Sequence, residues 1–128
     1  MLSLTRVEQV HVLCLILVLA KKKLGNNFRF RSYQLQRILS SSQAARELFI
    51  FSDSGPESFS PELESALGHL SLCGFLKHPD LQDPGKVTIP CSWLSWVDRI
   101  LREERMSKDI LSRIKRVSDY LVTNLRVH

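Results

Sequence analysis

The chain has 128 residues, of which 44% are hydrophobic and 24% charged, with a net charge of +5. This composition excludes a largely disordered chain, and the length suits one compact domain, which we expect to span residues 1–128. The mildly basic balance permits nucleic acid or another anionic partner without requiring one. The cysteines Cys14, Cys73 and Cys91 are odd in number and widely spaced. They therefore predict a reducing compartment with no disulfide framework.

The first predicted element is a long helix from Thr5 to Leu24. Thr5 and Glu8 have the spacing of a capping box, and Gly25 follows the last apolar residue as a stop signal. Residues 10–20, VHVLCLILVLA, are apolar nearly all round, which predicts a central core helix.

An apolar run of this kind can also belong to a membrane or signal segment. This run is too short to span a bilayer, and the three lysines that follow it do not form a small-residue cleavage site. We therefore expect a cytoplasmic protein that does not enter the membrane.

Shorter elements follow between residues 28 and 51. Residues 28–31, FRFR, alternate in polarity and indicate either a linker or a strand fragment. We expect a second helix, capped by Ser32, that buries Leu35, Ile38 and Leu39. A third helical segment is expected from Ala44 to Phe51, with Leu48 and Phe51 facing inward.

A well-signalled helix then begins after Ser60. Ser60 is a favoured cap, Pro61 suits the first helical position, and Glu62 and Glu64 complement the helix dipole. We expect Gly74 to end this helix. The predicted buried stripe consists of Leu63, Ala66, Leu67, Leu70 and Cys73.

The remaining chain predicts a hairpin and two helices. Phe75 and Leu76 begin one strand, residues 86–89 form the returning strand, and the connection is too long for a tight turn. Ser92 and Ser107 are the expected caps of the last two helices, which should pair antiparallel or pack back on the first helix. The apolar stripe predicted for the final helix consists of Ile110, Leu111, Ile114, Val117, Leu121 and Leu125.

This order predicts a mainly α fold with a small β-hairpin. It is the winged-helix-like order, a helix-turn-helix plus wing, in residues 1–90. Two additional C-terminal helices would form a helical pair in residues 91–128.

Two motifs in this order resemble a known family over about residues 10–90. The first is SYQLQRIL at residues 32–39, and the second is GPESFSPELESALGHLSLCGFLK at residues 55–77. Together they are similar to the SocA or Panacea antitoxin-like domains and the related YwgA-like proteins. The resemblance implies a non-enzymatic regulator, associated with toxin neutralisation or phage defence, that works by binding a protein partner.

The chemically reactive residues do not form a recognisable catalytic or metal motif. His69 and Cys73 lie four residues apart on one predicted helix, but no second pair at metal-site spacing accompanies them. The carboxylates of Glu62 and Glu64 are explained by the helix dipole. We therefore expect no enzyme, no catalytic or metal residues and no cofactor.

A nucleic-acid interpretation depends on basic residues outside the predicted recognition helix. That helix, residues 61–73, carries two acids and no Lys or Arg, which disfavours base reading in the major groove. The candidate phosphate contacts are Lys21, Lys22, Lys23, Arg29 and Arg31. The simpler explanation for the lysines is a solvated helix end that favours positive charge.

A protein-binding interpretation fits the acidic helix better. Glu62, Glu64, Trp93 and Trp96 are the candidate partner contacts, although core packing also explains the tryptophans. We predict a small regulatory module that binds a protein partner, such as a toxin or a larger complex, and a homodimer through the last helices is a further hypothesis. The alternative is a winged-helix nucleic-acid-binding protein.

Overall fold

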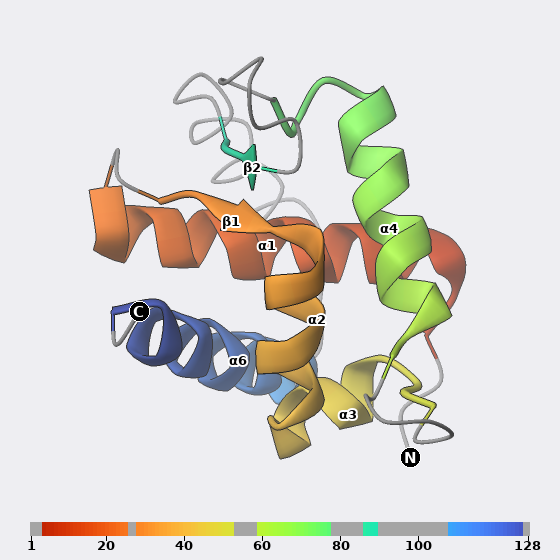
Figure 1. Cartoon of the computed structure of the whole chain (residues 1–128). Helices are drawn as coiled ribbons and strands as arrows, with labels where there is room; N and C mark the ends of the chain where they lie inside the picture. Colours follow the sequence, from red (N-terminus) through yellow and green to blue (C-terminus); the bar gives the residue numbers. More distant parts are fainter. Residues whose placement is uncertain (1–3, 26–27, 53–58, 78–85, 90–107, 127–128) are drawn as a thin grey trace.

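In the computed structural model, the described residues are 4–25, 28–52, 59–77, 86–89 and 108–126, and they form a mainly α protein (Figure 1). The mainly α prediction is thereby confirmed. The elements in these ranges are α1 (Arg6–Leu24), β1 (Phe30–Arg31), α2 (Ser32–Ser40), α3 (Gln43–Leu48), α4 (Pro61–Leu72), β2 (Lys86–Val87) and α6 (Lys108–Arg126).

Helix α1 begins and ends where the sequence predicts. The backbone N–H of Glu8 donates to Thr5 Oγ1 over 3.2 Å, and Thr5 N–H donates to Glu8 Oε1 over 3.1 Å, which completes the capping box. The helix stops at Gly25, whose φ of 72° lies in the left-handed region that glycine tolerates. Both ends of α1 are therefore set by local interactions.

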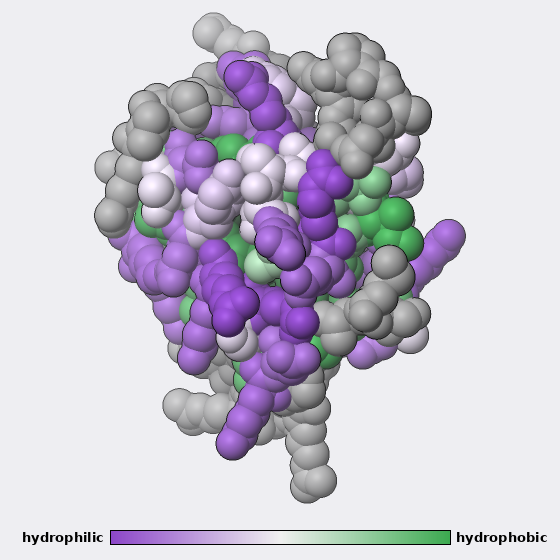
Figure 2. All heavy atoms as spheres, turned by 90° about the horizontal axis from the view of Figure 1, so that it is seen from below, coloured by the Kyte–Doolittle hydropathy of each residue, from purple (hydrophilic) through white to green (hydrophobic). Residues whose placement is uncertain are grey.

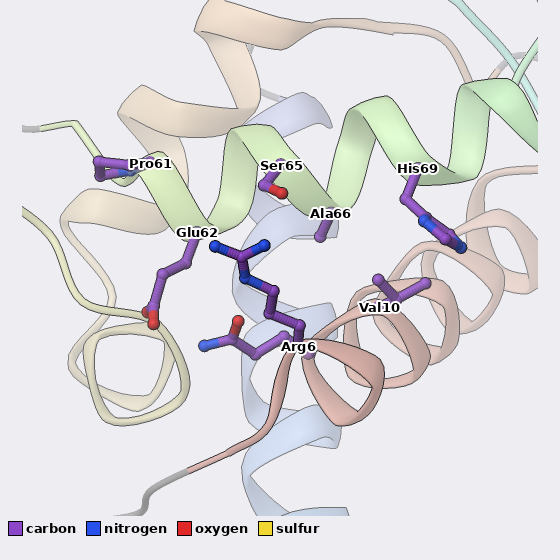
Figure 3. A pocket seen from close by; sticks show the side chains of 8 residues that line it. Arg6, Val10, Pro61, Glu62, Ser65, Ala66 and His69 are labelled. Atoms are coloured by element: carbon purple, nitrogen blue, oxygen red, sulfur yellow. The ribbon is translucent and has the colours of Figure 1, made fainter.

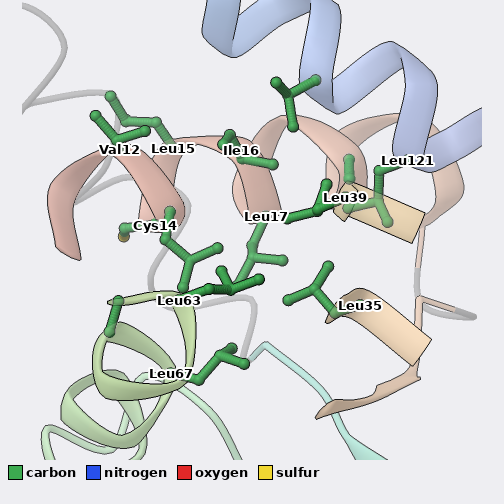
Figure 4. Close-up of a cluster of buried hydrophobic side chains, with 14 of the residues drawn as sticks. Val12, Cys14, Leu15, Ile16, Leu17, Leu35, Leu39, Leu63, Leu67 and Leu121 are labelled. Carbon is green, nitrogen blue, oxygen red and sulfur yellow. The ribbon is translucent and has the colours of Figure 1, made fainter. Parts of the chain in front are cut away.

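The middle of α1 forms the centre of the hydrophobic core. Every residue from 12 to 18 is buried. Helix α6 lies alongside α1, and α4 crosses it steeply, so α1 is covered from several directions (Figures 1 and 4). Within the described ranges, no helix has the length and apolarity needed to cross a membrane.

The solvent-facing sides of the helices carry mainly polar side chains. Figure 2 shows one face of the molecule, seen from below, on which hydrophilic residues predominate and apolar ones are scattered between them. On α6 this division is regular: Ile114, Val117 and Leu121 are buried, while Lys115 and Arg116 are exposed. The stripe predicted for the last helix therefore packs against α1 and is used inside the fold.

The β structure is small and draws on segments far apart in the chain. Strand β1 pairs antiparallel with β2, with Phe30 opposite Val87 and Arg31 opposite Lys86. A separate antiparallel bridge joins Lys77 and Thr88. The FRFR segment is thus a strand fragment at its end. Strand β2 is shorter than the predicted 86–89, and the prediction that Phe75 and Leu76 begin its partner strand is wrong, because β2 pairs with β1 instead.

Two boundaries between residues 31 and 51 differ from the prediction. Helix α2 starts at Ser32 itself, with Arg31 in the cap position, because the Ser32 hydroxyl donates to the carboxylate of Glu64 instead of capping. Helix α3 ends at Leu48, three residues before Phe51, because Phe49 adopts an extended backbone. Phe51 is consequently only half-buried.

Helix α4 confirms its predicted start and most of its buried stripe. Ser60 Oγ accepts from the N–H of Leu63 over 3.2 Å, and Pro61 occupies the first turn. The first four stripe residues are buried, but the prediction for Cys73 is wrong because its side chain is exposed. Cys73 lies past the last helical residue, immediately before the turn at Gly74, whose φ is 80°.

Several predicted features fall outside the described residues. These are the tip of the hairpin, the helix expected after Ser92, and the caps at Ser92 and Ser107. Trp93, Trp96 and Cys91 belong to the same stretch, so the predicted antiparallel pairing of the last two helices has no described counterpart. The alternative packing, of the final helix on the first, is what α6 and α1 adopt.

Candidate functional site

A cavity of about 330 Å³ lies between the beginnings of α1 and α4 (Figure 3). Polar residues dominate its lining: Arg6 and Gln9 from α1, with Glu62, Ser65 and His69 from α4. Figure 3 shows the Arg6 side chain reaching from α1 toward α4, between Glu62 and Ser65. The apolar side chains of Val10 and Ala66 lie between these polar groups.

Gln9 is the buried polar residue of this cavity. Only 6% of its surface is exposed, and no hydrogen bond joins its side-chain amide to another residue of the described chain. Gln9 lies three and four residues before Val12 and Leu13, on the apolar side of α1. That position is the sequence signal that could have drawn attention to it, because a glutamine on a core-facing stripe normally has a specific partner.

The two glutamates at the start of α4 make contacts within the fold. Glu62 Oε1 accepts from the backbone N–H of Ile50 over 2.7 Å, and Glu62 also lines the cavity. Glu64 accepts from the Ser32 hydroxyl over 3.0 Å and from Gln36 Nε2 over 3.4 Å. These predicted partner contacts thus also hold α4 against neighbouring segments.

A second buried glutamine, Gln36, forms side-chain hydrogen bonds with the backbone of Ser60 at the start of α4. Gln36 Nε2 donates to the Ser60 carbonyl over 2.9 Å, and the Ser60 N–H donates to Gln36 Oε1 over 3.0 Å. Only 4% of Gln36 and none of Ser60 is exposed. Sequence reasoning missed this pair because its two members are 24 residues apart.

The basic residues predicted to contact phosphate differ in their burial and in their partners within the fold. Lys21 is buried, with 6% exposure, and its ammonium donates to the carbonyl of Ile89. Lys23 forms an ion pair with Asp119 of α6. Lys22 and Arg29 are exposed, whereas Arg31 is half-buried. The burial of Lys21 and its hydrogen bond to Ile89 give no support to its predicted phosphate contact, which stays a prediction.

The outward side of α4 presents few groups suited to metal or nucleic acid. His69 and Cys73 are both exposed, yet the described residues hold no group of three potential metal ligands. The helix contains no Lys or Arg. At its end, Leu72 is 90% exposed.

No family model, curated protein or solved structure matches the chain. The arrangement of the side chains is therefore the basis for assigning a function. Among the described residues, the cavity between α1 and α4 brings a cation, a carboxylate and a largely buried glutamine to a common space.

Proposed function

We propose that this protein is a small non-enzymatic regulatory module that binds a protein partner at the start of α1 and α4. The observation that carries this proposal is a set of exposed apolar side chains beside the cavity. Val7 is 65% exposed, Ile50 68% and Phe59 45%. Exposed apolar side chains give a partner protein apolar area to bury, and burial of apolar area from water stabilises association.

Each of these three residues is connected, along the chain or by a hydrogen bond, to a residue that lines the cavity. Val7 follows Arg6 in the chain, Phe59 comes two residues before Pro61, and the backbone of Ile50 is hydrogen-bonded to Glu62. Single exposed apolar residues need no explanation, but three that are each connected to a lining residue supply area that a partner can bury.

A winged-helix-like fold is part of the same proposal. Its support is the chain order, in which β1 lies between α1 and α2 and pairs with β2 after α4, while Lys77 bridges to Thr88. The resemblance to antitoxin-like domains supports a partner such as a toxin or a larger complex. In that setting the module would act by binding its partner and not by catalysing a reaction.

The nucleic-acid alternative has less support. Groove readout favours Arg, Lys, Asn and Gln on the inserted helix, and α4 has none of them. Among the candidate phosphate contacts, Lys21 is buried and an ion pair engages Lys23. The other three candidates are Lys22 and Arg29, which are exposed, and Arg31, which is half-buried.

Site-specific photo-crosslinking tests the proposed function. A benzophenone amino acid is placed at Ile50, beside the cavity, and at Ser112, an exposed position on α6, as the matched control. We expect the Ile50 variant to capture a defined protein in the cells that produce the chain, and the Ser112 variant not to capture it.

Duplex DNA is the competing ligand in a parallel fluorescence-anisotropy titration. Tight binding that weakens steeply with salt, and that is lost in a Lys22→Ala, Arg29→Ala double variant, would establish the alternative instead. Equal crosslinking at Ile50 and Ser112 would contradict the proposed surface.

A further inference from the structure

The Gln9 side chain is an unused pair of hydrogen-bonding groups inside the cavity. Among the described residues, the fully buried side-chain polar atom that has no hydrogen-bond partner is Ser118 Oγ, so the Gln9 amide is not cut off from the open space of the cavity. Only 6% of the Gln9 surface is exposed, and its side chain has no hydrogen bond within the described chain. Its carbonyl oxygen and amino group are therefore available to a molecule that enters the cavity.

The same protein shows what a buried glutamine binds in this setting. Gln36 exchanges two hydrogen bonds with the peptide backbone at Ser60, donating over 2.9 Å and accepting over 3.0 Å. This two-bond arrangement matches the complementary donor and acceptor of an extended residue. Gln9 offers the same two groups to the cavity that Gln36 offers to Ser60.

The charges of the cavity favour a neutral, dipolar ligand over an anion. Arg6 contributes one positive charge and Glu62 one negative charge, and no ion pair between them is present in the described structure. Glu62 already accepts a hydrogen bond from one backbone N–H, that of Ile50. A peptide group suits both charges, because its carbonyl oxygen can accept from Arg6 while an N–H donates to the Glu62 carboxylate.

We propose that the cavity binds an extended backbone segment of the partner protein, with Gln9 exchanging two hydrogen bonds with one of its residues. This inference rests on the proposed function and specifies how the partner is recognised. Small partner side chains would pack on Val10 and Ala66, which line the same space. A volume of about 330 Å³ lies at the lower end of the range for ligand sites, so only a short stretch of backbone enters.

The test uses a displayed library of seven-residue peptides selected on the intact 128-residue chain, followed by calorimetric titration of the enriched peptides. Gln9→Met keeps the length of the side chain and removes both hydrogen-bonding groups. Gln43→Met makes the same change at an exposed position on α3 and is the matched control. We expect Gln9→Met to weaken peptide binding at least tenfold and Gln43→Met to leave it unchanged.

One further variant and one set of modified peptides make the result independent of how Gln9→Met folds. Ser65→Phe places a large side chain at a lining position that is exposed, and should abolish binding by filling the cavity. Methylation of single peptide nitrogens in the selected peptide should weaken binding only at the residues whose N–H donates to Gln9 or to Glu62.

Failure of this inference can be told apart from failure of the proposed function. Failure to enrich any peptide, or peptides whose affinity is equal for wild type, Gln9→Met and Ser65→Phe, would overturn backbone recognition in the cavity. If Ile50 crosslinking persists in that case, the protein-binding function stands and only the mode of recognition is wrong. Loss of both results would contradict the two proposals together.

Discussion

The most informative perturbation of the fold is Gln36→Met, which removes the hydrogen bonds from Gln36 to the Ser60 backbone and to Glu64. Gln36 and Ser60 are both buried, so water cannot replace the two hydrogen bonds between them. The Ser60 carbonyl keeps a second donor, the N–H of Glu64, at 3.1 Å. The Ser60 N–H has no other partner in the described chain and would be left unsatisfied.

The expected loss of stability follows from these contacts. An unsatisfied buried N–H costs about 1–3 kcal/mol, and the second lost hydrogen bond adds about 1 kcal/mol. The free energy of unfolding should therefore fall by about 2–4 kcal/mol, which is a large part of the roughly 5–15 kcal/mol typical of single domains. For a chain of this size the melting temperature should fall by roughly 10 °C.

Urea unfolding followed by far-ultraviolet circular dichroism measures this change. We expect a lower midpoint with an unchanged dependence on urea concentration, since the surface exposed on unfolding stays the same. Gln43→Met is again the control, because Gln43 is an exposed residue at the start of α3. A loss below about 0.5 kcal/mol, equal to that of the control, would refute the reasoning, since surface changes fall within that range.

Three further predictions concern the core, the cap and the thiols. Leu17→Ala should lower the free energy of unfolding by about 2–5 kcal/mol in the same urea assay, because Leu17 is fully buried at the centre of α1. A loss below about 1 kcal/mol would contradict that placement. Hydrogen bonds from the backbone and side chain of Thr5 lower the pKa of Glu8 from its usual 4.5. Ionised Glu8 therefore stabilises the fold at pH values above 4.5, and this stabilisation is lost as the pH falls through the lowered pKa. Thermal melts of wild type and Glu8→Gln should therefore differ at neutral pH and converge in acid, whereas a pH-independent difference would exclude this linkage. In a thiol-reagent assay Cys73→Ser should remove one rapidly reacting equivalent, while buried Cys14 reacts only on unfolding; an unchanged rapid phase would show that Cys73 is covered in solution.

The elements that the sequence predicts well are those fixed within one helical turn. Thr5 with Glu8, and Ser60 with Leu63, are each three residues apart, so their geometry follows from local backbone preference. The uniform apolar character of residues 10–20 likewise requires burial whatever surrounds them. These features determined where α1 and α4 begin and which helix lies at the centre.

The candidate site depends on contacts that only the tertiary structure makes. Lys21 belongs to a basic run in the sequence, yet the fold brings its ammonium to the carbonyl of Ile89, 68 residues away. Gln36 and Ser60 meet across 24 residues, and Gln9 lines a cavity with residues of α4 more than 50 positions along the chain. Charge and hydrogen-bonding capacity can be read from a residue type, but their use depends on which distant groups packing brings within about 3 Å. The sequence alone therefore determined the helices and the core, and the crossing of α1 and α4 decided which polar groups stabilise the fold and which face the cavity.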